Sequence, residues 1–114
     1  MRMWGVDPLL MCDQHLVGEH VEMHMFVGTI QKGISMAGYL ANGLVVVSMI
    51  PQRHKQLAAE MERRGMYHKS PLPSFEWNGP DGHIDDVESA AELVRRCPKC
   101  QERFNFYRDQ ENFK

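Results

Sequence analysis

The chain has 114 residues, of which 43% are hydrophobic and 25% are charged. This length suits one domain spanning residues 1–114, and the composition is that of an ordinary soluble globular protein, which excludes a disordered chain. The formal net charge of −2 does not by itself indicate a nucleic-acid partner, and no apolar run approaches the ~18 residues that a membrane span requires.

The first predicted helix covers residues 13–32. Asp7 and Pro8 are typical of a helix start, but we expect only one turn there, because Asp13 offers a second cap before a longer pattern. Gly33 ends that pattern. The residues that recur at helical spacing are Leu16, His20, Met23, Val27 and Ile30.

The next segments alternate between loop and helix. Residues 33–49 predict a loop with a buried hydrophobic plug, because the apolar run at 45–47 has no evident strand partner. A second helix begins near Pro51 and ends at Gly65. The proline- and glycine-rich residues 66–84 predict an ordered irregular loop.

A third helix is capped by Asp85 or Asp86 and stops near Cys97 and Pro98. The aromatic tail that follows, residues 104–107, is expected to pack back on the body. The sequence therefore predicts an all-α protein with three helices and long connections.

One face of the first helix carries His15, Glu19 and Glu22, which are four and three residues apart. Such a row is often only a solvated surface. The alternative is a row facing a cleft, in which a carboxylate acts in proton transfer or stabilises a cation.

A second constellation suggests zinc. His20 and His24 are four residues apart, and Cys97 and Cys100 form a cysteine pair with a two-residue gap. Together these four side chains predict a Cys2His2 site only as an alternative. The expectation is a metal-free protein with structural histidines and two thiols near a helix end.

Two blocks of the sequence resemble the pyrimidine-dimer DNA glycosylase/AP lyase family, the endonuclease V type of T-even phages and bacteria. The first is residues 12–24, CDQHLVGEHVEMH. The second runs from Arg53-His54 through EMERRG at 60–65 to HKSPL at 68–72. The aromatic residues 104–107 are similar to the family's C-terminal segment. The resemblance spans about two thirds of the chain.

The resemblance implies a compact three-helix fold whose N-terminal segment threads between helices. It also implies that the α-amine of Met1 attacks C1′ of a damaged nucleotide, forms an imine and permits strand cleavage, with Glu22 as the essential carboxylate and no cofactor. Arg2 and His15 match positions that line the site. An α-amine ordinarily has a pKa of about 7.7–8.0, which suits a nucleophile better than lysine at about 10.4.

Further substrate-binding candidates are Arg53, His54, His68, Lys69 and Tyr107, and the expected partner is double-stranded DNA with a damaged or modified base. The sequence departs from the family at Val21 and Met25, where arginines are common. These departures leave two alternatives: a glycosidase for a different modified base, or a zinc-stabilised DNA- or protein-binding module of the same fold.

The location and assembly of the protein are also expectations. The amino terminus meets Asp7 and Pro8 before any apolar run, so it does not resemble a secretory signal. Three cysteines, an odd number, suit a reducing compartment. We therefore expect a cytoplasmic, intracellular monomer of phage or bacterial origin.

Overall fold

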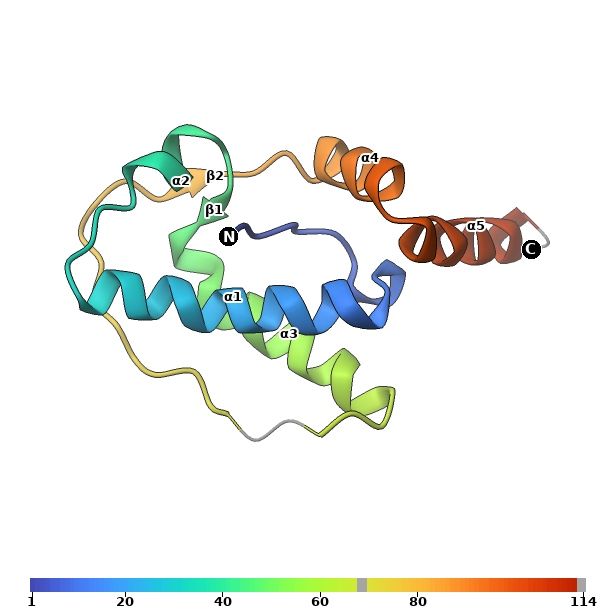
Figure 1. Cartoon of the computed structure of the whole chain (residues 1–114), viewed down its shortest axis with the longest axis horizontal. Helices are drawn as coiled ribbons and strands as arrows, with labels where there is room; N and C mark the ends of the chain where they lie inside the picture. The colour runs from blue at the N-terminus through green and yellow to red at the C-terminus, as the bar shows by residue number, and fades with distance from the viewer. Residues whose placement is uncertain (68–69, 113–114) are drawn as a thin grey trace.

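The computed structural model of the chain describes residues 1–67 and 70–112, and these form five α-helices, two short 3-10 helices and one two-stranded sheet (Figure 1). Their order is η1 (Pro8–Leu10), α1 (Asp13–Gln31), α2 (Ala37–Ala41), β1 (Val45–Val46), η2 (Val47–Met49), α3 (Ile50–Arg63), β2 (Gly82–His83), α4 (Asp86–Arg96) and α5 (Pro98–Asn112). The predicted all-α class is confirmed.

The three predicted helices are α1, α3 and α4, and they begin and end where the local signals place them. The Asp85 carboxylate accepts a hydrogen bond from the Glu88 backbone N–H (3.0 Å) and caps α4. Pro51 lies in the first turn of α3, and Gly65 follows that helix with a positive φ of 81°. One cap is unusual, because the sulfur of Cys12 accepts the N–H of His15 at the start of α1.

Helices α1 and α3 pack against each other and form the body of the fold (Figure 1). The side chains that they bury together form the centre of the hydrophobic core. These are Leu16, Met23, Phe26 and Val27 of α1 and Ile50, Leu57 and Met61 of α3.

The expectation that residues 45–47 lack a strand partner was wrong. Val45 pairs with His83 and Val46 with Gly82 in an antiparallel two-stranded sheet. Gly82 permits this pairing, because its φ is +82° and a Cβ there would lie 2.4 Å from the Val45 carbonyl oxygen. The expected hydrophobic plug is present, since Val45 and Val47 are buried.

The C-terminal helix α5 was not predicted, nor was the short α2. Cys97-Pro98 does end α4, but Pro98 also occupies the first position of a new helix, where proline is favoured. The aromatic tail consequently packs back only in part: Phe104 contacts the core, whereas Phe106 is 55% exposed. The Arg103 guanidinium bonds the Leu9 carbonyl oxygen (2.7 and 3.0 Å) and ties α5 to η1.

The N-terminal segment threads into the body, as expected. The Met3 backbone N–H donates to the Leu44 carbonyl oxygen (2.7 Å), and the Met3 and Trp4 side chains are buried. This anchoring fixes where the chain terminus lies. Among the described residues, no helix combines the length and apolar character needed to cross a membrane.

Candidate active site

An open cleft of about 650 Å³ lies where the N-terminal segment meets α1. Gln14, Gly18 and Glu22, each four residues apart, form its wall along one face of α1. The complete lining is Met1, Arg2, Trp4, Gln14, His15, Gly18, Glu19, Glu22, Leu44 and Arg96. Five residues singled out from the sequence therefore line one cavity: Met1, Arg2, His15, Glu19 and Glu22.

Glu22 is partly buried beside the chain terminus. Burial raises the pKa of its carboxyl group, and the neighbouring Glu19 carboxylate acts in the same direction. A hydrogen bond from the Arg2 backbone N–H and the positive charge of the Met1 amine oppose that rise. Because Arg2 directly follows Met1, this hydrogen bond holds the Glu22 carboxylate close to the α-amine.

The Arg2 side chain is already engaged by α4. Its guanidinium bonds the Glu92 carboxylate (2.7 Å) and the Ser89 hydroxyl (3.1 Å), and it lies 3.8 Å from the centre of the Trp4 ring. These contacts fix the segment that carries Met1. They also engage the Arg2 guanidinium, the group that the sequence predicted to bind substrate.

Arg53, which the sequence predicts to bind substrate, does not line the cleft. Its guanidinium forms a bidentate ion pair with the Glu19 carboxylate (2.5 and 2.9 Å), and both side chains are almost fully buried. Glu19 faces inward and closes the floor of the cleft, so the row on α1 is not a solvated surface.

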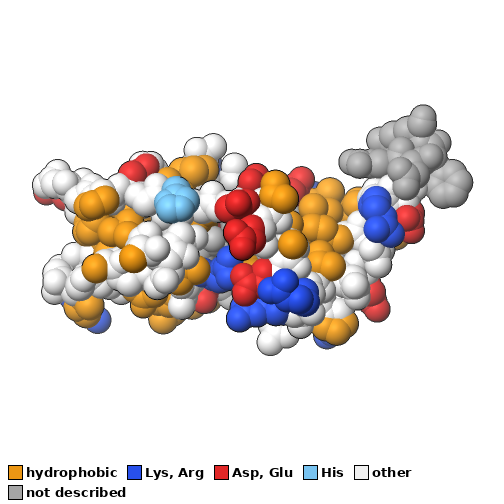
Figure 2. Space-filling model, turned by 90° about the horizontal axis from the view of Figure 1, so that it is seen from above, with side chains coloured by type: hydrophobic (Ala, Val, Ile, Leu, Met, Phe, Trp, Pro, Cys, Tyr) orange, Lys and Arg blue, Asp and Glu red, His pale blue; other side chains and the backbone are white. Residues whose placement is uncertain are grey.

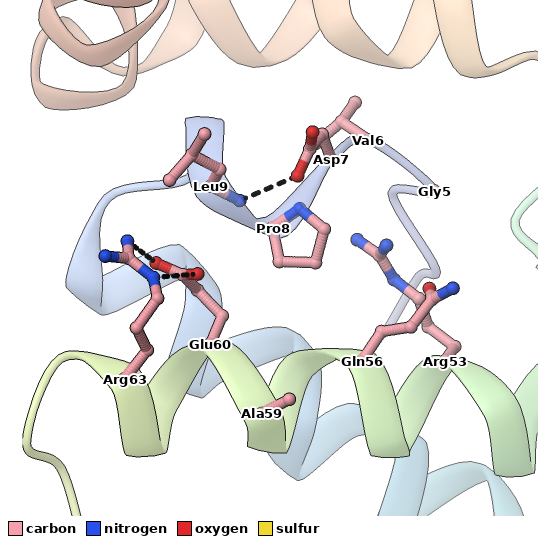
Figure 3. A pocket seen from close by; sticks show the side chains of 10 residues that line it. All are labelled: Gly5, Val6, Asp7, Pro8, Leu9, Arg53, Gln56, Ala59, Glu60 and Arg63. Carbon is pink, nitrogen blue, oxygen red and sulfur yellow. Dashed lines mark hydrogen bonds and ion pairs between the residues drawn. The ribbon is translucent and has the colours of Figure 1, made fainter.

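A second pocket, of about 570 Å³, lies between the N-terminal segment and α3 (Figure 3). Arg53 and Gln56 extend from α3 toward Gly5–Leu9 in this view, and Glu60 is paired with Arg63. Neither Met1 nor Glu22 lines this pocket. It is therefore separate from the candidate catalytic pair.

The predicted Cys2His2 zinc site was wrong in its grouping, because its histidines and cysteines belong to two different clusters. His20 and His24 of α1 meet His54 of α3, with the Nε2 atoms of His24 and His54 3.1 Å apart. Cys97 and Cys100 instead meet Cys12 and His15. His54 consequently does not line the cleft with Met1 and Glu22.

Of the remaining predicted site residues, Tyr107 lies in the described part of the chain and is not brought to the cleft. Tyr107 lies on α5, where its ring packs edge-on against Phe106 and does not line the cavity. His68 and Lys69 fall outside the described residues. Val21 and Met25, where family arginines were expected, are 47% and 49% exposed on the stripe of α1 next to the cleft wall.

The sequence interpretation missed Trp4, Arg96 and Cys12. Trp4 stands edge-on to His15 (ring centres 6.0 Å apart), and the guanidinium groups of Arg2 and Arg96 lie 3.8 and 6.0 Å from its ring centre. No local pattern marks Trp4 or Arg96 for this role. Cys12, in contrast, precedes His15 by three residues, which is the spacing of Cys97 and Cys100.

The charges on the outer face around α4 are mixed. Figure 2 looks onto the side of the molecule that lies at the top of Figure 1, and acidic and basic side chains lie next to one another in the middle of the view. This face therefore does not present the single broad positive surface expected of a general DNA-binding protein.

Comparison with known proteins gives one match. A family model described as pyrimidine dimer DNA glycosylase matches residues 1–74, while no curated protein and no solved structure matches the chain. The matched residues include all of α1 and α3, and with them Met1 and Glu22. They end before α4 and α5.

Proposed function

The chain belongs to the pyrimidine dimer DNA glycosylase family, and we propose that it removes a damaged pyrimidine from duplex DNA with the Met1 α-amine as its nucleophile. The observation that carries this proposal is the shared cleft of Met1 and Glu22, linked through the Arg2 backbone N–H. A nucleophile paired with a neighbouring carboxylate is the arrangement that covalent glycosylase chemistry requires.

The reaction follows from these two groups. The neutral amine nitrogen forms a bond to C1′ of the damaged nucleotide, and the bond from C1′ to the base breaks, so the base leaves with the electron pair. The nitrogen, now bonded to C1′, gives up one proton, the bond from C1′ to the ring oxygen breaks, and the ring oxygen takes a proton, which leaves a protonated imine between Met1 and C1′. Removal of a proton from C2′ then expels the 3′ phosphate, which is the AP-lyase step.

Glu22 is the group that serves both halves of this reaction. As a carboxylate, it stabilises the positive charge that develops on the sugar and later on the imine. The same oxygen atoms are close enough to the amine, through the Arg2 hydrogen bond, to exchange protons with it. The raised pKa of Glu22 makes it a better proton acceptor than an exposed glutamate.

The target nucleotide must leave the DNA double helix to reach this cleft. Enzymes of this class distort or flip a nucleotide, and a lesion lowers the cost because the damaged base is already poorly stacked. Val21 and Met25 are exposed on α1, and neither lines the cleft. These apolar side chains stand where the family resemblance implies arginines, and this difference supports the alternative that the enzyme acts on a different modified base.

The proposal is tested with ultraviolet-irradiated duplex oligonucleotide and protein that begins at Met1. We expect base release and strand cleavage at the lesion, and no cleavage of the unirradiated duplex. The matched control carries one glycine before Met1, left by protease cleavage of a tag, which moves the amine out of the cleft. Equal cleavage by both proteins would contradict the amine mechanism.

Restoring the arginines at positions 21 and 25 is expected to strengthen DNA binding. Each new phosphate contact adds about 0.9 to the slope of log affinity against log salt, so Val21→Arg with Met25→Arg raises that slope by about 1.8. Fluorescence anisotropy over a salt series measures it. The control, Ile34→Arg with Val87→Arg, adds the same charge at exposed sites outside the cleft. An equal increase in the slope for this control would show that the effect does not depend on where the charge is added.

A further inference from the structure

A second chemical centre lies behind the cleft, where the start of α1 meets the junction of α4 and α5. It consists of Cys12, His15, Cys97 and Cys100, whose sulfur and nitrogen atoms all lie within 4.8 Å of one another. Cys12 and Cys100 are buried, and His15 and Cys97 are partly buried. No step of the proposed reaction uses these thiols.

We propose that these four residues bind a zinc ion that anchors the two C-terminal helices to the body of the enzyme. Zinc in structural sites takes four sulfur and nitrogen ligands at about 2.3 and 2.0–2.1 Å in a tetrahedron. Such a tetrahedron places sulfur atoms about 3.8 Å apart and sulfur about 3.6 Å from nitrogen. In the protein, Cys12 Sγ lies 3.8 Å from Cys97 Sγ, and His15 Nδ1 lies 3.2 and 3.7 Å from the Cys12 and Cys100 sulfurs.

The three sulfur atoms accept hydrogen bonds in the way that metal-bound thiolates do. Each of the three sulfurs accepts one backbone N–H: that of His15 on Cys12 (3.4 Å), that of Cys12 on Cys100 (3.3 Å) and that of Cys100 on Cys97 (3.4 Å). A neutral thiol is a weak acceptor, whereas a thiolate is a strong one. Hydrogen bonds of this kind orient and stabilise the ligands of a metal.

Two helix starts contribute further. Cys12 is the N-cap of α1, and Cys97 immediately precedes Pro98, the first residue of α5. The positive ends of α1 and α5 therefore meet at the cluster and stabilise negative charge there, opposed by the negative end of α4, whose C-cap is Cys97. Three thiolates and one neutral histidine around Zn²⁺ leave a net charge of −1, which these two dipoles help to balance.

The site has a structural consequence for the enzyme. Its two halves are separated by more than 80 residues, and Cys97 and Cys100 lie beyond residues 1–74, which the family model matches. A bound zinc would hold Nδ1 of His15 and leave its proton on Nε2, which fixes one wall of the cleft. It would also keep Arg96, adjacent to Cys97, at that same cleft.

The first test is the metal content of the full chain, purified under reducing conditions without a metal-affinity tag. Mass spectrometry of the elements is expected to give about one zinc per chain and no stoichiometric iron. Substitution with Co²⁺ should give thiolate-to-cobalt charge-transfer bands. Protein that stays metal-free when equimolar zinc is offered, or that holds a disulfide between Cys12 and Cys97 under these conditions, would overturn the proposal.

Variants separate this site from the histidine cluster. Cys97→Ser changes the least buried of the three cysteines and is expected to abolish zinc binding and the cobalt bands. His24→Gln, in the histidine cluster, should leave both unchanged. Zinc lost in His24→Gln but kept in Cys97→Ser would assign the metal to the histidine cluster and overturn the proposal.

The anchoring role has a readout that does not depend on the variants folding. When a chelator removes zinc from the wild-type protein, amide hydrogen exchange is expected to accelerate across α4 and α5 more than across α3. Returning zinc should restore the slow exchange. Unchanged exchange in α4 and α5 after complete zinc removal would overturn the anchoring role.

Discussion

Glu22→Gln is expected to lower the single-turnover rate of base excision by about 10²–10⁴-fold. The substitution preserves the size of the side chain but removes its negative charge and its ability to accept a proton. Because this carboxylate lines the cleft beside the Met1 amine, both the developing sugar cation and the proton transfers lose their partner. Rapid-quench measurement on a duplex with one pyrimidine dimer gives this rate.

The matched control is Glu62→Gln on α3, an exposed glutamate that does not line the cleft. It should excise at the wild-type rate. Affinity for the lesion duplex should change little in Glu22→Gln, since the loss lies in the chemical step. Equal rates for the two variants would remove Glu22 from the mechanism.

The pH profile gives an independent check on the same residue. Burial raises the pKa of Glu22, so the ionised fraction falls at a higher pH than it does for an exposed glutamate. If the carboxylate is the active form, the rate falls as pH decreases through this raised pKa. Glu22→Gln should lose the part of the acid limb that comes from the carboxylate and keep the part that comes from protonation of the Met1 amine, while Glu62→Gln should keep both.

The second large effect concerns stability. Arg53→Met is expected to destabilise the protein by about 3–5 kcal/mol, because it leaves the buried Glu19 carboxylate without its partner. Urea denaturation measures this loss. Adding Glu19→Leu should recover much of it, since two apolar side chains then replace the buried ion pair.

Arg95→Met is the matched control, because Arg95 is exposed on α4. A surface substitution of this kind changes stability by no more than about 0.5 kcal/mol. If Arg53 were a DNA contact on the surface, Arg53→Met would behave like Arg95→Met in urea and would lose only DNA affinity. That result would contradict the buried role.

The helices could be predicted because their signals are local. Asp85, Pro51 and Gly65 act on neighbouring backbone groups, so their effects follow from the order of residues alone. The pairing of β1 with β2 joins segments more than 30 residues apart and rests on Gly82, whose role depends on the approach of Val45. Nothing near either segment in the sequence indicates that contact.

The candidate site also has residues that the sequence could bring together and one that it could not. His15 and Glu22 share one helix face, and the family resemblance placed Met1 opposite them, so these residues could be brought together before the structure was known. Arg53 could not be placed, because its orientation depends on how α3 crosses α1. An arginine on an amphipathic helix has the same local pattern whether it meets DNA or a buried carboxylate.

The two metal-ligand clusters show the limit of spacing arguments. A two-residue gap predicts that Cys97 and Cys100 converge, and a gap of three predicts the same for His20 and His24. Neither gap says which pair meets which. The answer depends on the turn at Pro98, which brings the cysteine pair to Cys12 and His15 instead.

The most direct test of the central claim is borohydride trapping on duplex DNA that carries an abasic site, followed by mapping of the adduct. Protein that begins at Met1 is expected to form a covalent complex, and the modified peptide is expected to carry the sugar on the Met1 α-amine. An adduct on a lysine side chain, or no adduct from folded protein, would contradict the proposal that the chain terminus is the nucleophile.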